Sequence, residues 1–561
     1  MKWYSYLFEA RSLQQYLFIG GKLADMVAAS DLIDDLTDSI LSNVLMALKL
    51  QDAFGCSSGE GQVVHFIRRA GGAFYVVAEG TSGHEALNRL QALWSLTVQQ
   101  MLPGMIVIQS RGLGQTPYEA IESGIMKLIE CRTDQRISFP IAGPFVLRSQ
   151  RTGKAAVRKD GDEFIDLTLS GHRRYADSCK KQPHPSGLMQ RFRPGQDVSW
   201  PLNLQLKLKR RTENDFPFKG EDQDIAIIHI DGNGLGNLLQ KINQFFKENS
   251  SAYMRFFRNF SDGLQRATSR AAQDASEEIL LKVMHNENLK CMPARPLVLG
   301  GDDLTILVRA DLGIPFAEKF IEAFEKRTQE FLGMLRHECD GLPEYLTACA
   351  GIAFQKAGQP FMMGYQLAEH LCATSKRYSR KDRSSRSQDI MPSSMSFYRI
   401  TGTLQDDWES ILNNELTIHR SDEAPILLTL EAYAVGQCTT ELPKISQLTR
   451  LFTDLNDSRS PWNLRKARQL LTLLHTDFDE ARRFWEHISE QEKKESSRTQ
   501  TSDRLAYLKQ EMKKLVALCP DEFYSFMYQP DQGVCRSPLA DLVTLAAIGF
   551  KQSDLSSISG S

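Results

Sequence analysis

The sequence has no closely spaced cysteine pairs and no long apolar segment. Its ten cysteines are scattered and no two are spaced as C-x-x-C, which excludes a zinc ribbon or a thioredoxin-type motif. No apolar run reaches the about 18–20 residues that cross a bilayer. A glutamate and an arginine, Glu9 and Arg11, interrupt the N-terminal stretch, where a signal peptide is continuously apolar. We therefore expect a cytoplasmic protein with no membrane contact.

An excess of positive charge is also absent. The 67 Lys and Arg residues are balanced by 69 Asp and Glu residues, for a formal net charge of −2. This balance argues against a protein coated with basic charge for nucleic acid, although it allows a local basic surface. The densest basic cluster, KLKRR at 207–211, fits a solvated linker and a nucleic-acid or partner contact equally well. At 561 residues the chain is too long for one core, and we expect three or four domains.

One order of predicted elements occurs twice. Strands are indicated by β-branched and aromatic runs bounded by glycine, and helices by apolar residues spaced three and four apart. The first copy comprises a strand at 3–9, a helical stretch at 13–50, strands at 62–68 and 73–79, a helix near 85–101, a strand at 105–109 and a helix from about 118. The second copy comprises a strand at 225–231, a helical stretch at 251–284, strands at 296–299 and 304–308, a helix at 316–335, a strand at 347–354 and a helix at 361–376.

Strand–helix–strand–strand–helix–strand is the ferredoxin-like order, which is the frame of polymerase palms and nucleotidyl cyclases. We therefore predict an α+β fold with two ferredoxin-like palm domains. The predicted division is a first palm-like domain at 1–131, an irregular inter-palm linker at 132–220, a second palm domain at 221–402 and an α-helical C-terminal domain at 403–561.

The two copies differ at the hairpin between their middle strands. The first copy has GGAF (Gly71–Phe74), whereas the second has GGDD (Gly300–Asp303). At the end of the first strand, FEARSL in the first copy corresponds to IDGNGL in the second, which contains Asp231. Only the second copy keeps acids at the hairpin, so we place the chemistry in the second palm.

Asp231, Asp302 and Asp303 are the candidate catalytic and metal-binding residues. Phosphoryl transfer needs neutralised phosphates and an activated hydroxyl, and two divalent ions about 3.5–4 Å apart supply both. Magnesium uses one or two carboxylates, with phosphate oxygens and water as its other ligands. The first strand of a ferredoxin-like sheet neighbours the central hairpin, so these carboxylates can converge. Because successive strand residues point to opposite faces, we favour Asp303 over Asp302 as the partner of Asp231.

Two glycine-rich segments are candidates for nucleotide binding. Gly232, Asn233 and Gly234 lie between a strand and a helix, where backbone N–H groups can hold a triphosphate. Gly300 and Gly301 allow a nucleotide to approach the backbone closely and tolerate positive φ. Each glycine signal is weak alone, and their joint occurrence with the acids in a repeated palm is what points to a site.

Lys376 and His229 are two further residues near the predicted site. As a compact cation, Lys376 suits the γ-phosphate of a nucleotide, although a lysine favoured by a helix C-terminus explains it nearly as well. His229 shares the strand face of Asp231 if the alternation holds. We interpret His229 as a core histidine and leave it out of the site.

Four segments resemble the large subunit of type III CRISPR effector complexes, the Cas-ten family. They are FEARSLQQYLFIGGKLADMVAASDLI, HIDGNGLG, LGGDD, and TACAGIAF followed by AEHLCATSKRYSR. The family has two palm domains related to diguanylate cyclases, and the resemblance covers both predicted palms.

The resemblance implies a concrete activity. Members convert ATP into cyclic oligoadenylates through 3′–5′ links and release pyrophosphate, usually when target RNA is bound to the assembled complex. By position, Asp231, Asp302 and Asp303 resemble the catalytic acids that bind Mg²⁺ or Mn²⁺, and Lys376 resembles the triphosphate lysine. Guide and target RNA and other effector subunits are the implied partners.

Departures from the family pattern carry expectations of their own. Many relatives begin with an HD nuclease domain, but no histidine here is followed by aspartate, so we do not expect cleavage of single-stranded DNA. Many relatives carry a cysteine zinc cluster between the palms, whereas FVLRSQRTGKAAV at 145–157 contains no cysteine; we predict no zinc. The family often has an acid near Ser396.

Two other functions stay open. The chain fits an assembly subunit that binds guide–target RNA and has a weak or dormant palm. It also fits a stand-alone cyclase that makes a cyclic dinucleotide, in which case a homodimer is a natural form. The acids kept in the second copy favour the enzyme, and the sequence does not distinguish ATP from GTP as substrate.

Overall fold

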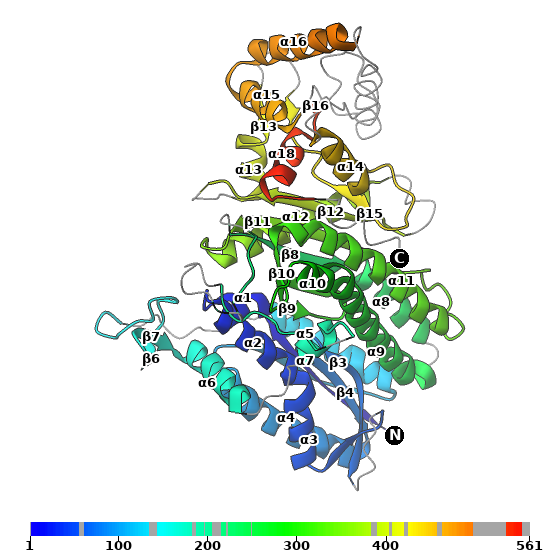
Figure 1. The fold of residues 1–561 in the computed structure, drawn as a ribbon. Coiled ribbons are helices and arrows are strands. Elements are labelled where there is room, and N and C mark those ends of the chain that lie inside the picture. The colour runs from blue at the N-terminus through cyan, green and yellow to red at the C-terminus, as the bar shows by residue number, and fades with distance from the viewer. Residues whose placement is uncertain are drawn as a thin grey trace.

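Figure 1 shows the chain as a computed structural model, with the first sheet at the bottom, the second in the middle and a mainly helical C-terminal region at the top. The structure describes residues 2–54, 61–133, 143–181, 187–195, 197–204, 212, 215–219, 223–247, 250–382, 390–402, 407–419, 425–456, 463–496 and 535–551. The basic cluster at 207–211 lies outside these residues.

The first sheet has the strand order β2-β3-β4-β1-β5. Its strands are β1 (Trp3–Arg11), β2 (Leu50–Asp52), β3 (Gln62–Ala70), β4 (Ala73–Glu79) and β5 (Ile106–Gly114). Its helical segments are α1 (Leu13–Phe18), α2 (Leu23–Asp35), the π-helical η1 (Leu36–Ile40), α3 (Leu41–Ala47), α4 (Gly80–Met101) and α5 (Pro117–Thr133). The central β1 is antiparallel to both β4 and β5, which is the ferredoxin-like arrangement.

Aromatic side chains fill the core on one face of this sheet. Phe8 of β1 and Phe74 of β4 stack with their ring centres 5.3 Å apart, and Trp94 of α4 lies edge-on at 5.3 Å from Phe8. All three are fully buried. The opposite face, which includes Leu7 and Val77, joins a core shared with the second sheet. Both faces of the first palm are therefore covered.

The segment between the palms corrects the prediction of an irregular linker. It contains the hairpin β6 (Ala156–Asp160) and β7 (Glu163–Asp166), followed by α6 (Leu167–Lys181) and α7 (Gly187–Phe192). Arg173 of α6 pairs with Asp25 of α2 at 2.9 Å and with Asp160 and Glu163 at 3.0 Å each. The ion pair between Arg173 and Asp25 thus attaches this segment to the first palm.

The second sheet has the strand order β15-β12-β11-β8-β10-β9. Its strands are β8 (Asp224–Gly232), β9 (Ala294–Leu299), β10 (Asp303–Arg309), β11 (Ala348–Lys356), β12 (Ser393–Arg399) and β15 (Tyr433–Val435). Its helical segments are α8 (Leu235–Phe246), α9 (Ser250–Ala275), the π-helical η3 (Ser276–Leu281), α10 (Lys282–Asn286), the 3-10 turn η4 (Ala310–Leu312), α11 (Gly313–Leu335) and α12 (Phe361–Lys381). The β8–β11 part repeats the ferredoxin-like order, so the α+β fold with two palms is confirmed.

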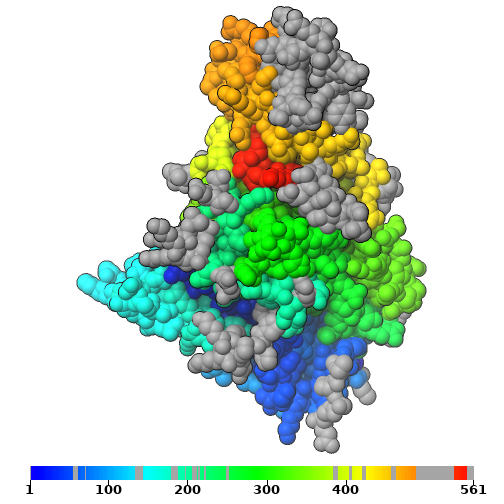
Figure 2. All heavy atoms as spheres, viewed as in Figure 1, coloured from blue at the N-terminus to red at the C-terminus, as the bar shows by residue number. Residues whose placement is uncertain are grey.

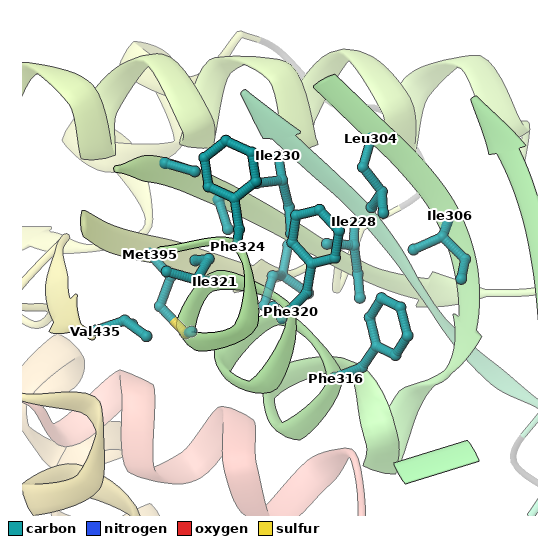
Figure 3. Packing of buried hydrophobic residues seen from close by; sticks show 14 of the residues in the cluster. Ile228, Ile230, Leu304, Ile306, Phe316, Phe320, Ile321, Phe324, Met395 and Val435 are labelled. Atoms are coloured by element: carbon teal, nitrogen blue, oxygen red, sulfur yellow. The ribbon is translucent and has the colours of Figure 1, made fainter. Parts of the chain in front are cut away.

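Strand β8 is apolar on both faces because helices cover both. Phe316, Phe320 and Phe324 recur along one side of α11 and pack against Ile228 and Ile230 (Figure 3). The alternate residues of β8 join a second cluster with α12 and with α1 and α2 of the first palm. The side chains of His229 and Asp231 follow this second set because strand residues alternate.

The two palms contact each other closely. Phe18 of α1 lies 4.9 Å from Phe361 and 4.6 Å from Tyr365 of α12, measured between ring centres. The Oγ of Ser30 donates a hydrogen bond to the carbonyl of Leu297 in β9. Figure 2 shows the blue N-terminal part against the green second palm. The first palm therefore supports the strand that leads into the GGDD hairpin.

The C-terminal region is mainly helical in the part that the structure describes, as predicted. Its elements are α13 (Trp408–Asn414), β13 (Thr417–Ile418), β14 (Ile426–Leu427), α14 (Ile445–Leu455), α15 (Leu464–Thr476), α16 (Phe478–Ser496), β16 (Cys535–Arg536) and α18 (Leu539–Ala547). It also supplies β15, which pairs with β12 at the edge of the second sheet. Among the described helices, none has the length and apolar character needed to cross a bilayer.

Candidate active site

Asp231 and Asp303 are directly opposite each other on neighbouring strands. The register of β8 and β10 pairs Asp303 with Asp231, and the next pair on the same face is Thr305 with His229. Opposed residues in an antiparallel pair present their side chains on one face, with Cβ atoms about 4.5–5.5 Å apart. The fold thus brings together two carboxylates separated by 72 positions (303 − 231) in the sequence.

Asp302 and Asp303 are adjacent at the hairpin but line different cavities. Its carbonyl accepts a hydrogen bond of 3.0 Å from the N–H of Gly232. It lines a cavity of about 250 Å³ beside α8 and α9, whereas Asp303 lines a smaller cavity of about 70 Å³ toward α1 and α2. A Cβ atom on Gly232 would lie 2.9 Å from the Cβ of Asp302, so glycine at 232 lets the hairpin approach β8.

The three carboxyls crowd each other electrostatically. Burial, then the charges of Asp231 and Asp303, raise the pKa of Asp302 to about 7. Burial and the charge of Asp231 raise the pKa of Asp303 to about 6, although backbone N–H groups at the hairpin oppose this shift. A nearby cation would favour the ionised forms of both groups.

The carboxylates of the site provide some of the ligands that magnesium needs, but not all of them. In the described part of the chain, no three or more His, Cys, Asp or Glu side chains are grouped as a ready-made metal centre. Magnesium rarely uses such a cage, because it binds through one or two carboxylates and takes its other ligands from phosphates and water. Asp231 and Asp303, paired on one face, fit this incomplete type of site.

Lys376 contacts Asp231, the residue that comes before the glycine turn. Its Nζ donates hydrogen bonds to the carboxylate of Asp231 and, at 2.8 Å, to the carbonyl of Gly232. The Lys376 side chain is 16% exposed and that of Asp231 is 40% exposed. Helix α12 continues to Lys381, so Lys376 is not in the last turn, and explaining it by the helix C-terminus is wrong.

The glycines of the GGDD hairpin do not have the backbone conformation, positive φ, that glycine tolerates. Neither Gly300 nor Gly301 adopts positive φ, whereas Gly71 (φ +62) and Gly72 (φ +71) of the first hairpin do. At Gly300, a Cβ atom would lie 1.6 Å from the Oδ1 of Asp303. The need for glycine at 300 therefore comes from the space that this carboxylate occupies.

The glycine turn after β8 is held by β11. Asn233 is buried, and its Nδ2 donates to the Oγ1 of Thr347 at 3.1 Å while its N–H donates to the Thr347 carbonyl at 2.8 Å. Gly234 has φ +69 and is the residue before α8. These contacts fix the turn at the N-terminus of α8, and nucleotide binding by Gly232, Asn233 and Gly234 stays a prediction.

His229 is a buried neighbour of the site. Its Nδ1 lies 3.2 Å from the Oγ1 of Thr305, and its ring packs edge-on against Tyr365 at 5.8 Å between centres. Burial lowers the pKa of His229 below its usual value. It thus has the contacts of a core histidine.

Two residues near the site have no sequence signal. Arg68 of β3 and Tyr75 of β4, both in the first palm, line the same cavity as Asp302. They belong to the copy without acids, and only the packing of the two palms places them there.

The fold and the paired aspartates define a palm-type domain with an acidic hairpin. Residues 224–385 match the family model for the second palm domain of Cas10/Cmr2. This part of the chain is therefore a Cas10/Cmr2 second palm domain, and the family suggested by the motifs is confirmed.

Solved structures show a looser similarity. A Csm1–Csm4 cassette in complex with cA4 matches at 14% identity and a TM-score of 0.39, covering 70% of this chain and 55% of that chain. A cassette in complex with one ATP matches at 13% identity and a TM-score of 0.40, covering 68% and 54%. A Csm1–Csm4 subcomplex of the type III-A CRISPR-Csm interference complex matches at 14% and 0.39, covering 68% and 54%. The chain spans about half the length of these solved chains, and no curated protein matches it.

Proposed function

We propose that the chain is a metal-dependent nucleotidyltransferase that converts ATP into cyclic oligoadenylates with 3′–5′ links. The observation that carries this proposal is the direct opposition of Asp231 and Asp303 in a Cas10/Cmr2 second palm, with Asp302 beside them. In each step the 3′-hydroxyl of one nucleotide attacks the α-phosphorus of another, the bond to pyrophosphate breaks, and the hydroxyl proton is lost.

The protein's own groups supply binding and orientation. Asp231 and Asp303 would hold Mg²⁺ or Mn²⁺, which when bound neutralises phosphate charge and activates the hydroxyl. Lys376, which donates hydrogen bonds to Asp231 and Gly232, would donate to a phosphate instead when nucleotide binds. The N–H groups at the start of α8 add a fixed positive potential for the triphosphate.

One observation favours a regulated or dormant palm as the second candidate. Lys376 is bound to Asp231, and burial raises the pKa of Asp302 and of Asp303. In this reading the chain is mainly an assembly subunit that binds guide and target RNA with other CRISPR effector subunits. Its palm becomes active only when the complex changes these contacts.

A product assay separates these functions. The purified protein is incubated with labelled ATP or GTP and Mg²⁺ or Mn²⁺, with and without effector subunits and guide–target RNA, and the products are resolved. We expect cyclic oligoadenylate from ATP and none from Asp303→Asn. Equal product from the variant would refute the site. Product only in the complex favours the RNA-regulated palm, whereas a cyclic dinucleotide from the protein alone favours a stand-alone cyclase, whose homodimer would be checked by mass.

A further inference from the structure

Four residues form a row across one face of the second sheet. The strand registers pair Asp303 with Asp231, Asp231 with Cys349, and Cys349 with Ser394. These residues belong to β10, β8, β11 and β12, which are consecutive in the sheet. Paired residues on neighbouring strands point to the same side of a sheet. The two carboxylates of the site thus continue into a cysteine and a serine to which the proposed reaction gives no role.

Helix α12 covers this row at very short range. A Cβ atom on Gly351 of β11 would lie 1.9 Å from the carbonyl oxygen of Ala368, and one on Gly364 of α12 would lie 2.6 Å from the Cδ1 of Ile227. Non-bonded heavy atoms are most favourable at about 3.5–4.0 Å, so glycine is needed at both positions. The helix backbone therefore lies directly on the sheet, and the side chains between the two are small.

Ser394 is the centre of a hydrogen-bonded cluster under α12. Its Oγ lies 2.5 Å from the Oγ of Ser375, 2.7 Å from the Oγ of Ser379 and 3.4 Å from the Sγ of Cys349. It also donates to the Ser375 carbonyl at 3.3 Å. All four residues are fully buried. Because Ser375 and Ser379 lie on successive turns of α12, their contacts with Ser394 oppose rotation of the helix about its axis.

The same helix carries Lys376 to the site. Lys376 follows Ser375 in the sequence, and its Nζ donates to the Asp231 carboxylate and to the Gly232 carbonyl. Successive helix residues are about 100° apart around the axis. Ser375 and Lys376 therefore reach different parts of the row, the serine at β12 and the lysine at β8. A rotation that broke the serine contacts would also displace the Lys376 ammonium.

We propose that Ser394 is a positioning residue, which holds α12 in the rotation at which Lys376 binds the phosphates of the nucleotide. This role rests on the proposed function, in which Lys376 donates to a phosphate. Ser394 is fully buried, so it acts through the helix and not by contact with substrate. Hydrogen bonds weaken steeply as their angle departs from the optimum, and a rotated α12 would therefore weaken the contact between lysine and phosphate.

Ser396 provides a matched control on the same strand. It lies two residues after Ser394 and thus on the same face of β12, and it too is fully buried. Among the described residues its Oγ has no hydrogen-bond partner. Ser396→Ala therefore removes a buried hydroxyl of the same kind without removing a hydrogen bond to α12.

Steady-state kinetics of product formation from labelled ATP test this role. Rates are measured for wild type, Ser394→Ala, Ser379→Ala and Ser396→Ala, on the protein alone and with effector subunits and guide–target RNA. A charged hydrogen bond that is weakened but not lost should raise the KM for ATP by about 3- to 10-fold in Ser394→Ala and Ser379→Ala, with a smaller change in kcat. Ser396→Ala should match wild type. In a Lys376→Ala background, Ser394→Ala should leave the KM unchanged, because the residue through which it acts is gone.

Three results would overturn this role and leave the proposed function intact. One is a lower thermal unfolding midpoint in Ser394→Ala with an unchanged KM, which would show a purely structural role. The others are an equal rise in KM in Ser394→Ala and Ser396→Ala, and a rise by the same factor in the Lys376→Ala background. If Ser394→Ala does not fold, Ser379→Ala decides alone, because it removes the same contact from the helix side and alanine favours a helix. Absence of product from wild type in every preparation would refute the proposed function and this role with it.

Discussion

Replacing Gly300 with alanine should disable the site without unfolding the second palm. The added Cβ would lie 1.6 Å from the Oδ1 of Asp303, whereas non-bonded heavy atoms are most favourable at about 3.5–4.0 Å. The Asp303 carboxylate must therefore move by about 2 Å. The backbone at 300 is not in the left-handed region, so alanine meets no other obstacle there.

The size of the effect follows from this displacement. A misplacement of about 1 Å in a catalytic group can cost about 100-fold in rate, so Gly300→Ala should lower cyclic oligoadenylate formation by about 100-fold or more. Gly333→Ala in α11 is the matched control, because an added Cβ there meets no atom within 4 Å. The assay is the rate of product formation from labelled ATP, with the thermal unfolding midpoint measured on the same preparations. Equal rates for Gly300→Ala and Gly333→Ala would refute this account of Asp303.

Two further predictions concern Lys376 and Glu325. Lys376→Ala should raise the KM for ATP by about 10-fold or more, because a charged phosphate contact is lost, whereas Lys381→Ala, an exposed lysine of the same helix, should not; an unchanged KM for both would contradict the phosphate role. Glu325 of α11 is fully buried and accepts hydrogen bonds from the Ser393 hydroxyl at 2.6 Å and the Gln437 N–H at 2.8 Å. Burial raises its pKa to about 7, so the folded state holds this proton more tightly than the unfolded state, and stability should fall as pH rises from about 4.5 to 7 and level off above. Glu325→Gln should flatten the unfolding midpoint across this range, and an unchanged slope would contradict the raised pKa.

The strand pairing at the site could be predicted from sequence because two patterns coincide there. The apolar run of β8 indicates a central strand, and GGDD indicates the tip of a neighbouring hairpin. In the ferredoxin-like order these elements must be adjacent, which brings Asp231 toward Asp303. The alternation of strand residues then separates Asp302 from Asp303, as the two cavities show.

Other features depend on contacts that no local pattern reveals. The sequence at 132–220 predicts an irregular linker, but Arg173 of α6 pairs with Asp25 of α2, far away in the sequence. Gly300 suggested positive φ, whereas the reason for glycine there is the carboxylate of Asp303. The position of Arg68 depends on a one-residue bulge at Ile67, and a bulge has no clear sequence signal. Each of these outcomes is set by packing between distant segments.

The most direct test of the central claim is metal binding in the presence of a nucleotide that cannot react. Mn²⁺ binding to the full chain is followed by electron paramagnetic resonance with α,β-methylene-ATP present, for wild type, Asp303→Asn and Asp340→Asn, an exposed aspartate that serves as control. We predict nucleotide-dependent Mn²⁺ binding to wild type and Asp340→Asn, and its loss in Asp303→Asn. Equal Mn²⁺ binding in all three proteins would contradict the claim that these carboxylates hold divalent ions beside the phosphates.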